Sequence, residues 1–377
     1  MQQTGRISNL DGLRFLAAAV VAICHFDIIK AYYGLERTGW RFFSNAAQMA
    51  VSFFFVLSGF LITYLLLKEK MARPENRFRL FRFYGKRIRR IWPLYYLLLF
   101  ISFFVLPHIA WLEQHTDLSN ELHMKRLVGY LVWLPNYTEY NFGPQPFMGQ
   151  TWSLAVEEFF YLFFPIGLYY VKQKNVFRYL FLLTFLSLLL TIVVHFLILN
   201  SSLSANLKSI MYVITDKYRI YAFGAGALVA WVLINTNQIK GKWNLITRQK
   251  MVAIFLTLLL TGLIIGGITF SWFTQQIYAF LFSLLMLSLV SSDIRYTLLN
   301  HSVLVYLGKI SYGIYMLHPL AIVICLKMSS HFKPLGMTGE FLLSILSLLL
   351  TILFSALSYE IMEKYFLKIN RNIKLTE

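Results

Sequence analysis

The sequence predicts an all-α protein that crosses a membrane about ten times, as a single membrane domain over residues 1–377 with both termini in the cytoplasm. Three observations indicate this fold class. The 377-residue chain is 58% hydrophobic and only 14% charged, whereas a soluble domain carries roughly 25% charged residues. Long apolar stretches recur along the chain, and Lys and Arg collect in alternate loops between them. This composition excludes a set of soluble domains, a disordered chain, a collagen-like chain and a disulfide-stapled fold.

Ten apolar stretches have roughly the length of a membrane-spanning helix, about 20 residues. The first begins beside Asp11 and Arg14 and contains His25, and no cleavage pattern of small residues follows it, so we interpret it as an uncleaved span. The boundary between the seventh and the eighth, at Thr269–Gln276, is the least distinct. The ten stretches are Leu13–Ile29, Ala47–Leu67, Pro93–Ile109, Trp152–Val171, Tyr179–Leu199, Ser209–Asn235, Met251–Phe270, Trp272–Val290, Val303–Met328 and Gly339–Tyr359.

The basic residues predict the orientation. Ten Lys and Arg residues lie between Lys68 and Arg90, and further basic groups follow the fourth, sixth and tenth stretches. Residues 110–150 hold only Lys125 and Arg126 against four acidic residues. By the positive-inside rule the basic loops are cytoplasmic, and 110–150 is the main non-cytoplasmic loop. Its apolar and aromatic content is compatible with a re-entrant segment or with a surface loop. The net charge of +18 follows alternate loops, so we expect no nucleic-acid partner.

Cys24 and Cys325 lie inside apolar runs, where we expect them to fill space rather than form a disulfide or bind a metal. The eight histidines are scattered, without the spacing of a metal-binding pair on one helix face. We therefore expect no metal and no tightly bound cofactor.

Charged and titratable side chains at membrane depth usually face the protein interior and often mark a functional site. Arg14 and His25 are eleven residues apart, so they project from one helix face, separated by roughly 16 Å. Histidine is the usual general base for a hydroxyl, although a hydrogen-bonded packing histidine is an alternative. Arg87 and Arg90 share a helix face and suit the phosphates of an anionic donor, or else they set topology and bind anionic lipid.

Two further charged segments start predicted spans. Glu157 and Glu158 follow Trp152 and Ser153, where a structural salt bridge is the alternative to a catalytic carboxylate. Asp216, Lys217 and Arg219 enter the sixth stretch, where mutual ion pairing explains them without catalysis.

Together these segments resemble the acyltransferase-3 family of integral membrane O-acyltransferases, over nearly the whole chain from Ile7 to about Glu363. Lys217 departs from the family pattern, in which an uncharged residue is more common. Many members append a soluble esterase-like domain, and we expect this chain to be the stand-alone form without one. The segments that carry the resemblance are Leu10–Arg14 followed by His25, Phe53–Ile62, Phe83–Tyr84 with Arg87–Pro93, Thr151–Leu154 with Glu157 and Phe160–Tyr161, and Ile310–Pro319.

The resemblance implies transfer of an acyl group, usually acetyl, from cytoplasmic acyl-CoA as a co-substrate to a hydroxyl of a cell-surface or lipid-linked glycan. It also implies a multi-pass protein of the bacterial inner membrane. The acceptor stays open between a lipopolysaccharide O-antigen, a capsule, an exopolysaccharide, a peptidoglycan precursor and a small metabolite, and the oligomeric state is not predicted.

On this hypothesis His25 deprotonates the acceptor hydroxyl or carries the acyl group itself, and Glu157 orients or charges its imidazole. Arg14, Arg87 and Arg90 hold the nucleotide end of the donor. The candidates to line the pocket are Asp11, Trp152, Ser153, Arg219, Tyr315 and His318.

A glycolipid flippase or a secondary transporter is the main alternative, because several spans with buried charges suit transport as well. The sequence shows no matching pair of short spans broken by Gly or Pro, which inverted-repeat transporters usually have. Acyl transfer by the purified protein distinguishes the two functions.

Overall fold

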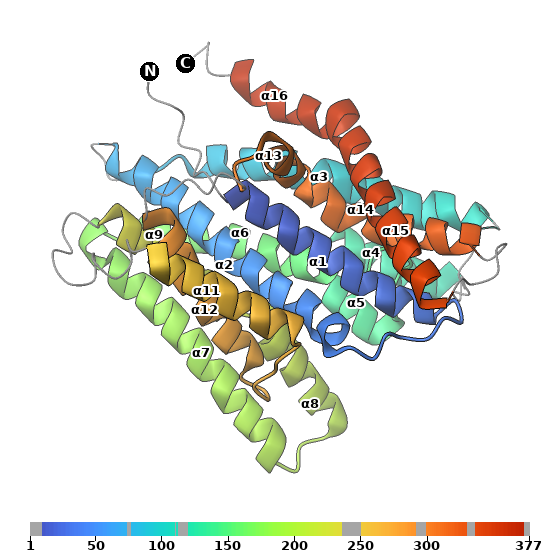
Figure 1. The fold of residues 1–377 in the computed structure, drawn as a ribbon. Helices are drawn as coiled ribbons and strands as arrows, with labels where there is room; N and C mark the ends of the chain where they lie inside the picture. Colours follow the sequence, from blue (N-terminus) through green and yellow to red (C-terminus); the bar gives the residue numbers. More distant parts are fainter. Residues whose placement is uncertain are drawn as a thin grey trace. The chain divides into compact units, whose positions relative to one another are not determined.

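The computed structural model describes residues 10–73, 77–109, 111, 120–235, 250–291, 299–329 and 336–372 (Figure 1). Within these ranges the chain is helical and contains no β-strand, only an isolated bridge between Phe270 and Trp272. The predicted all-α class is therefore confirmed. The chain divides into two compact units that interleave along the sequence. Unit 1 comprises residues 1–10, 48–80 and 156–301, and unit 2 comprises residues 11–47, 81–155 and 302–377.

Eight helical segments of the described chain are long and apolar enough to cross a membrane. Each coincides with a predicted stretch. The other two predicted stretches are also helical: α6 (Thr151–Tyr170) carries two glutamates, and α11 (Lys250–Ile265) has only 16 residues. The protein is a multi-pass membrane protein, and the count of ten spans and the side of the termini stay predictions. The eight segments are Leu10–Ala31, Arg41–Met71, Leu80–His108, Gln173–Asn200, Ile210–Ile234, Ser271–Val290, Ser311–Ser329 and Gly336–Lys368.

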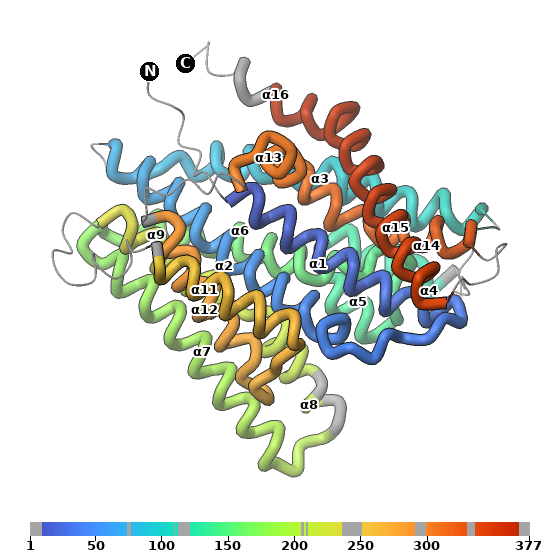
Figure 2. The backbone as a smooth tube through the Cα atoms, viewed as in Figure 1, coloured from blue at the N-terminus to red at the C-terminus, as the bar shows by residue number. Residues whose placement is uncertain are grey.

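Unit 1 is held together by close helix contacts at glycine. A Cβ at Gly59 would lie 1.9 Å from the carbonyl oxygen of Phe223, and a Cβ at Gly226 would lie 1.9 Å from that of Val56. Small residues let membrane helices approach to backbone contact, so α2 and α9 pack directly against each other. The helices of unit 1, traced in Figure 2, are α2 (Arg41–Met71, from residue 48), α6 from residue 156, η4 (Gln173–Asn175), α7 (Val176–Asn200), α8 (Ala205–Tyr212), the π-helix η5 (Val213–Lys217), α9 (Ile220–Ile234), α11 and α12 (Thr274–Ser291).

A buried lysine caps the C-terminal end of α6. Lys70 is only 1% exposed, and its Nζ donates to the carbonyl oxygens of Leu168 at 2.7 Å and Val171 at 2.5 Å. Carbonyl groups at a helix C-terminus lack intrahelical partners and carry partial negative charge. Lys70, counted above among the basic loop residues, therefore caps a helix.

Unit 2 is organised around α14 (Ser311–Ser329), one of its most buried helices. Ile322 and Leu326 of α14 pack against Phe26, and Val323 packs against Leu106 and Phe147. The helix α15 runs alongside α14. The helices of unit 2 are α1 (Leu10–Ala31, from residue 11), the start of α2, α3 (Leu80–Phe100, from residue 81), the π-helix η1 (Ile101–Val105), η2 (Leu106–His108), α4 (Asn120–Leu131), α5 (Pro135–Phe142), the start of α6, α13 (Ser302–Lys309), α14, α15 (Gly336–Ser358), the π-helix η6 (Tyr359–Glu363) and α16 (Lys364–Asn372).

The segment predicted as a loop at 110–150 is mostly helical where the structure describes it. α4 and α5 form a short hairpin whose Tyr130 is fully buried. Tyr95 of α3 donates to the carbonyl oxygen of Tyr130 at 2.7 Å and stacks on Trp133 with ring centroids 3.9 Å apart. Burial and the nearby Glu139 carboxylate raise the pKa of the Tyr130 phenol. The non-cytoplasmic location of this hairpin and its re-entrant character stay predictions, as does the single domain. Both cysteines are buried.

Candidate functional site

The segment Ile310–Pro319, at the start of α14, places successive side chains against different helices of unit 2. Ser311 donates to the carbonyl oxygen of Gly308 at 2.9 Å, and Tyr312 donates to that of Ile91 in α3 at 2.7 Å. A Cβ on Gly313 would lie 3.0 Å from the Cβ of Ser355 in α15. These contacts hold α14 in position. The other two polar side chains of this segment, Tyr315 and His318, contact Ser153 and His25 respectively.

His25 and His318 form a hydrogen-bonded pair. The Nδ1 of His25 lies 2.7 Å from the Nε2 of His318, and the ring centroids are 4.9 Å apart. His25 is half-buried and His318 is fully buried. The two residues are 293 positions apart in the chain, and the structure brings both predicted candidates together.

The hydrogen bonds of the pair define which nitrogen is basic. Nδ1 of His318 lies 3.3 Å from the carbonyl oxygen of Ile314, which only accepts hydrogen bonds. His318 therefore carries its proton on Nδ1, and its Nε2 accepts. His25 must then donate from Nδ1, so its Nε2 keeps the lone pair. This is the tautomer that a general base or a nucleophile requires.

Tyr315 extends this cluster to the first turn of α6. Its hydroxyl lies 2.6 Å from the Ser153 hydroxyl and donates to the carbonyl oxygen of Gln150 at 3.1 Å. Its ring lies 6.0 Å from the His318 ring, edge to face. Trp152, the neighbouring candidate, is largely buried. Four predicted residues, His25, Ser153, Tyr315 and His318, thus form one connected cluster within unit 2.

Arg14 offers an unused donor. Its side chain is half-buried, and its Nε is buried without a hydrogen-bond partner among the described residues of unit 2. Asp11 lies one turn earlier, where α13 approaches so closely that a Cβ on Gly308 would lie 2.1 Å from the Asp11 carbonyl oxygen. A buried N–H without an acceptor is costly, so this position suits a ligand that accepts hydrogen bonds.

Arg87 and Arg90 are both half-buried on α3. The Arg87 guanidinium lies over the Phe83 ring, 5.5 Å from its centroid. Arg90 interacts electrostatically with the buried carboxylate of Glu363. Arg90 therefore has an acidic neighbour within its own unit, which sequence analysis did not anticipate.

Glu157 belongs to unit 1. Its carboxylate accepts hydrogen bonds from the hydroxyls of Ser58 and Tyr161. Its predicted pairing with His25, a residue of unit 2, stays a prediction.

Arg219, also in unit 1, is 2% exposed and has a left-handed backbone conformation with φ of 33°. Its Nε donates to the carbonyl oxygen of Asp216 at 2.6 Å, and its terminal nitrogens donate to Gln48, Ser52 and Gln275 at distances between 2.7 and 3.2 Å. The Asp216 carboxylate lies 3.7 Å away. These bonds account for the buried charge without a ligand, and a role in lining the pocket stays a prediction.

A second charged cluster, not predicted from the sequence, lies at the end of α1. Lys30 is 2% exposed, and its Nζ lies 3.3 Å from Asp27, 3.1 Å from Thr38 and 2.5 Å from Glu340 at the start of α15. A signal was present, because Asp27 and Lys30 are oppositely charged, three residues apart and next to an apolar run.

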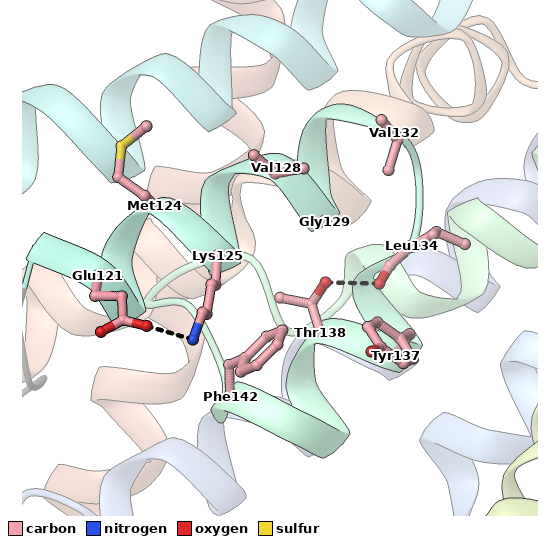
Figure 3. A pocket seen from close by; sticks show the side chains of 10 residues that line it. All are labelled: Glu121, Met124, Lys125, Val128, Gly129, Val132, Leu134, Tyr137, Thr138 and Phe142. Atoms are coloured by element: carbon pink, nitrogen blue, oxygen red, sulfur yellow. Dashed lines mark hydrogen bonds and ion pairs between the residues drawn. The ribbon is translucent and has the colours of Figure 1, made fainter.

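A pocket of about 450 Å³ lies along α4 and α5 in unit 2 (Figure 3). Val128, Val132 and Leu134 line it, and at one end Lys125 donates to Glu121 at 2.6 Å. None of the predicted site residues lines this pocket.

Residues 7–360 match the family model described as an acyltransferase domain, that of the acyltransferase-3 family. The chain belongs to this family. The match spans every candidate residue named above, so the resemblance seen in the motifs is confirmed.

Relatives in the acyltransferase family are O-acetyltransferases by name. The chain is 25% identical to the O-acetyltransferase OatA of Staphylococcus aureus (strain NCTC 8325 / PS 47) over 371 residues, which cover 95% of this chain and 56% of OatA. It is 26% identical to the putative peptidoglycan O-acetyltransferase YrhL of Bacillus subtilis over 396 residues, which cover 95% of this chain and 54% of YrhL. The chain thus spans about half the length of these relatives. No solved structure matches it.

Proposed function

We propose that this protein transfers an acyl group, most simply acetyl, from cytoplasmic acyl-CoA to a hydroxyl of an envelope glycan, with Nε2 of His25 as the reacting base. The observation that carries this proposal is the 2.7 Å bond between His25 and His318 inside a membrane acyltransferase domain. The names of the relatives favour acetyl as the acyl group and a peptidoglycan sugar as the acceptor.

In the proposed reaction, Nε2 of His25 takes the proton of the acceptor hydroxyl while the hydroxyl oxygen attacks the thioester carbonyl carbon. The carbon–sulfur bond breaks, and the coenzyme A thiolate leaves and takes the proton from the imidazolium. The Nδ1–H of His25 stays bonded to His318 throughout, so the ring does not turn as it gains and loses charge. If His25 instead carries the acyl group, the same nitrogen attacks the thioester carbonyl carbon, the carbon–sulfur bond breaks and the thiolate leaves. The acceptor hydroxyl then attacks the acyl-imidazole and frees His25 while its proton goes to the thiolate, so both routes need the same tautomer.

We propose His318 for the orienting role first predicted for Glu157. Each ring nitrogen makes one good hydrogen bond, and Nδ1 of His25 already bonds to His318. A carboxylate only accepts hydrogen bonds, so a carboxylate beside Nε2 would require a proton on that nitrogen and remove the lone pair that the chemistry requires. Glu157 is bonded to two hydroxyls in unit 1, which supports a structural role for it.

We propose that Arg14, Arg87 and Arg90 bind the phosphates of the donor, which places this end of the site at the cytoplasmic face of the inner membrane. Guanidinium groups fit phosphate oxygens, and acyl-CoA is a polyanion of the cytoplasm. The unpaired Nε of Arg14 supports this role most directly. Arg90 would bind phosphate while it also interacts with the Glu363 carboxylate, so we expect it to contribute less to donor binding than Arg14 does.

The test is transfer of radiolabelled acetyl from acetyl-CoA to peptidoglycan fragments by the purified protein in liposomes. The wild-type protein is expected to label the glycan, and His25→Ala is expected to abolish labelling. His195→Ala is the matched control, because His195 is a buried histidine of α7 whose Nδ1 bonds the Thr191 carbonyl oxygen of its own helix. Glycolipid flux without any acyl transfer would overturn the proposal in favour of a transporter, and labelling of small hydroxylated metabolites alone would replace the glycan acceptor.

A further inference from the structure

Two buried amides flank the first turn of α6 in unit 2. Asn136 of α5 is 5% exposed, and Gln150, just before α6, is 2% exposed. The Nδ2 of Asn136 donates to the carbonyl oxygen of Trp152 at 3.3 Å. The Nε2 of Gln150 donates to the carbonyl oxygens of Phe147 at 2.9 Å and Met316 at 2.8 Å. The NH2 groups of both amides thus donate hydrogen bonds to backbone carbonyl oxygens.

These bonds define the orientation of each amide and leave its oxygen unused. Rotating either amide by 180° would place its oxygen against a carbonyl oxygen, which cannot donate. The Oδ1 of Asn136 and the Oε1 of Gln150 are buried and have no donor among the described residues of unit 2. Buried polar atoms are almost always hydrogen-bonded, and leaving one unsatisfied is costly. Two such acceptors, on residues that flank one turn of α6, indicate a site for a molecule that brings hydroxyl or N–H donors.

The contacts connect Gln150 to the residues around the histidine pair and connect Asn136 to the same turn of α6 through Trp152. The backbone carbonyl of Gln150 accepts the hydrogen bond of Tyr315, and the side chain of Gln150 bonds the next residue of α14. Tyr315 in turn contacts Ser153 and lies against His318, the partner of His25. Gln150 therefore belongs to the cluster around the histidine pair, and Asn136 is bonded to the adjacent turn of α6.

We infer that Gln150 and Asn136 form a subsite for the sugar acceptor, in which their amide oxygens accept hydrogen bonds from sugar hydroxyls that do not react. A sugar ring presents several O–H donors around the reacting one, which suits two acceptors near a single base. This inference rests on the proposed function and names how its acceptor is held. The amide N–H groups of the donor's pantetheine arm are the other source of the same hydrogen bonds, and the test separates the two.

The experiment measures the KM for glycan fragments and the KM for acetyl-CoA separately, in Gln150→Met and in Asn136→Leu. Loss of a hydrogen bond to a sugar hydroxyl is expected to raise the glycan KM roughly tenfold in each variant and leave the acetyl-CoA KM unchanged. Asn141→Leu is the control, because Asn141 is an exposed amide of α5 that donates to the carbonyl oxygen of Tyr137 in its own helix. A rise in the acetyl-CoA KM instead would assign the amides to the pantetheine arm and overturn the inference.

A second measurement tests the inference if Gln150→Met or Asn136→Leu fails to fold. Deoxy glycan fragments, each lacking one hydroxyl, are tested on the wild-type protein and on Gln150→Glu, which keeps an acceptor oxygen. If the inference holds, one deoxy fragment binds the wild-type protein roughly tenfold more weakly than its parent, and Gln150→Glu shows a similar loss for the same fragment. If every deoxy fragment binds the wild-type protein as well as its parent, the subsite is absent. Transfer with unchanged glycan KM in both variants defeats only this inference, whereas no transfer by the wild-type protein defeats the proposed function.

Discussion

Nδ1 of His25 and Nε2 of His318 lie 2.7 Å apart and join two segments separated by 293 residues. Because His318 also bonds a backbone carbonyl of its own helix at 3.3 Å, the pair has one consistent arrangement of protons. That arrangement leaves the basic nitrogen of His25 without a hydrogen bond among the described residues of unit 2. The expected effects of substitution follow from this relationship.

His318→Ala is expected to lower kcat by about 10- to 100-fold, because His25 loses the acceptor that selects its tautomer. His318→Gln, whose amide oxygen can accept the same hydrogen bond, is expected to recover part of that loss. The pH dependence of kcat checks this, since the orienting role predicts a changed profile in His318→Ala. Equal kcat values in His318→Ala and wild-type protein would contradict the role.

His25→Ala is expected to lower kcat by roughly 10²- to 10⁴-fold, the usual contribution of a general base. The covalent route is checked by quenching the enzyme with radiolabelled acetyl-CoA before the glycan is added. Protein-bound label that is present in wild-type protein and absent in His25→Ala would indicate an acyl-histidine. Absence of label from both, together with rapid glycan labelling by wild-type protein, would favour the base.

Arg14→Ala is expected to raise the dissociation constant for acetyl-CoA about tenfold, because a charge-assisted hydrogen bond to phosphate is lost. Arg14→Lys is expected to recover only part of the affinity, since it keeps the charge but not the planar fork. Titration calorimetry measures both. Arg178→Ala, at an exposed arginine of α7, is the control and is expected to bind as the wild-type protein does. Unchanged affinity in Arg14→Ala would remove Arg14 from the donor site.

Gly226→Val is expected to destabilise the protein by about 3 kcal/mol or more, because its Cβ would meet the carbonyl oxygen of Val56 at 1.9 Å. Backbone cannot move aside as a flexible side chain can. Thermal unfolding in detergent measures the effect. Gly262→Ala in α11 is the control, since its added Cβ would meet no described atom within 4 Å beyond the backbone of its own helix. Equal unfolding temperatures for the two variants would contradict the close packing of α2 and α9.

The stability of the α4–α5 hairpin is expected to fall at high pH. Burial, and then the Glu139 carboxylate, raise the pKa of Tyr130 above its ordinary value of 10.0. The unfolded chain loses this proton first, so stability is intact below about pH 10 and declines as the pH rises further. Hydrogen exchange of residues 120–142 measures the decline. Tyr130→Phe is expected to flatten it and to cost about 1 kcal/mol at neutral pH, because the bond to Glu139 at 3.1 Å is lost. Tyr140→Phe, at an exposed tyrosine, is the control.

Sequence alone determined the helical class, the apolar stretches and the family, because hydropathy and motif spacing are local properties of the chain. It also identified His25, Ser153, Tyr315 and His318 as separate candidates. It placed the orienting role on Glu157, and it did not identify Gln150 or Asn136, because an amide in a polar segment has no distinguishing pattern. It also counted Lys70 with the basic loop residues, although this side chain caps α6.

Only the tertiary structure decided which of these groups meet. A hydrogen bond between His25 and His318 depends on how α1 and α14 pack, and an error of about 1 Å in that packing would break it. The oxygens of Gln150 and Asn136 can be recognised as unsatisfied only once the positions of the neighbouring hydrogen-bond donors are known. Local sequence sets which helices form and which residues are polar, whereas the satisfaction of buried polar atoms depends on contacts between residues far apart in the chain.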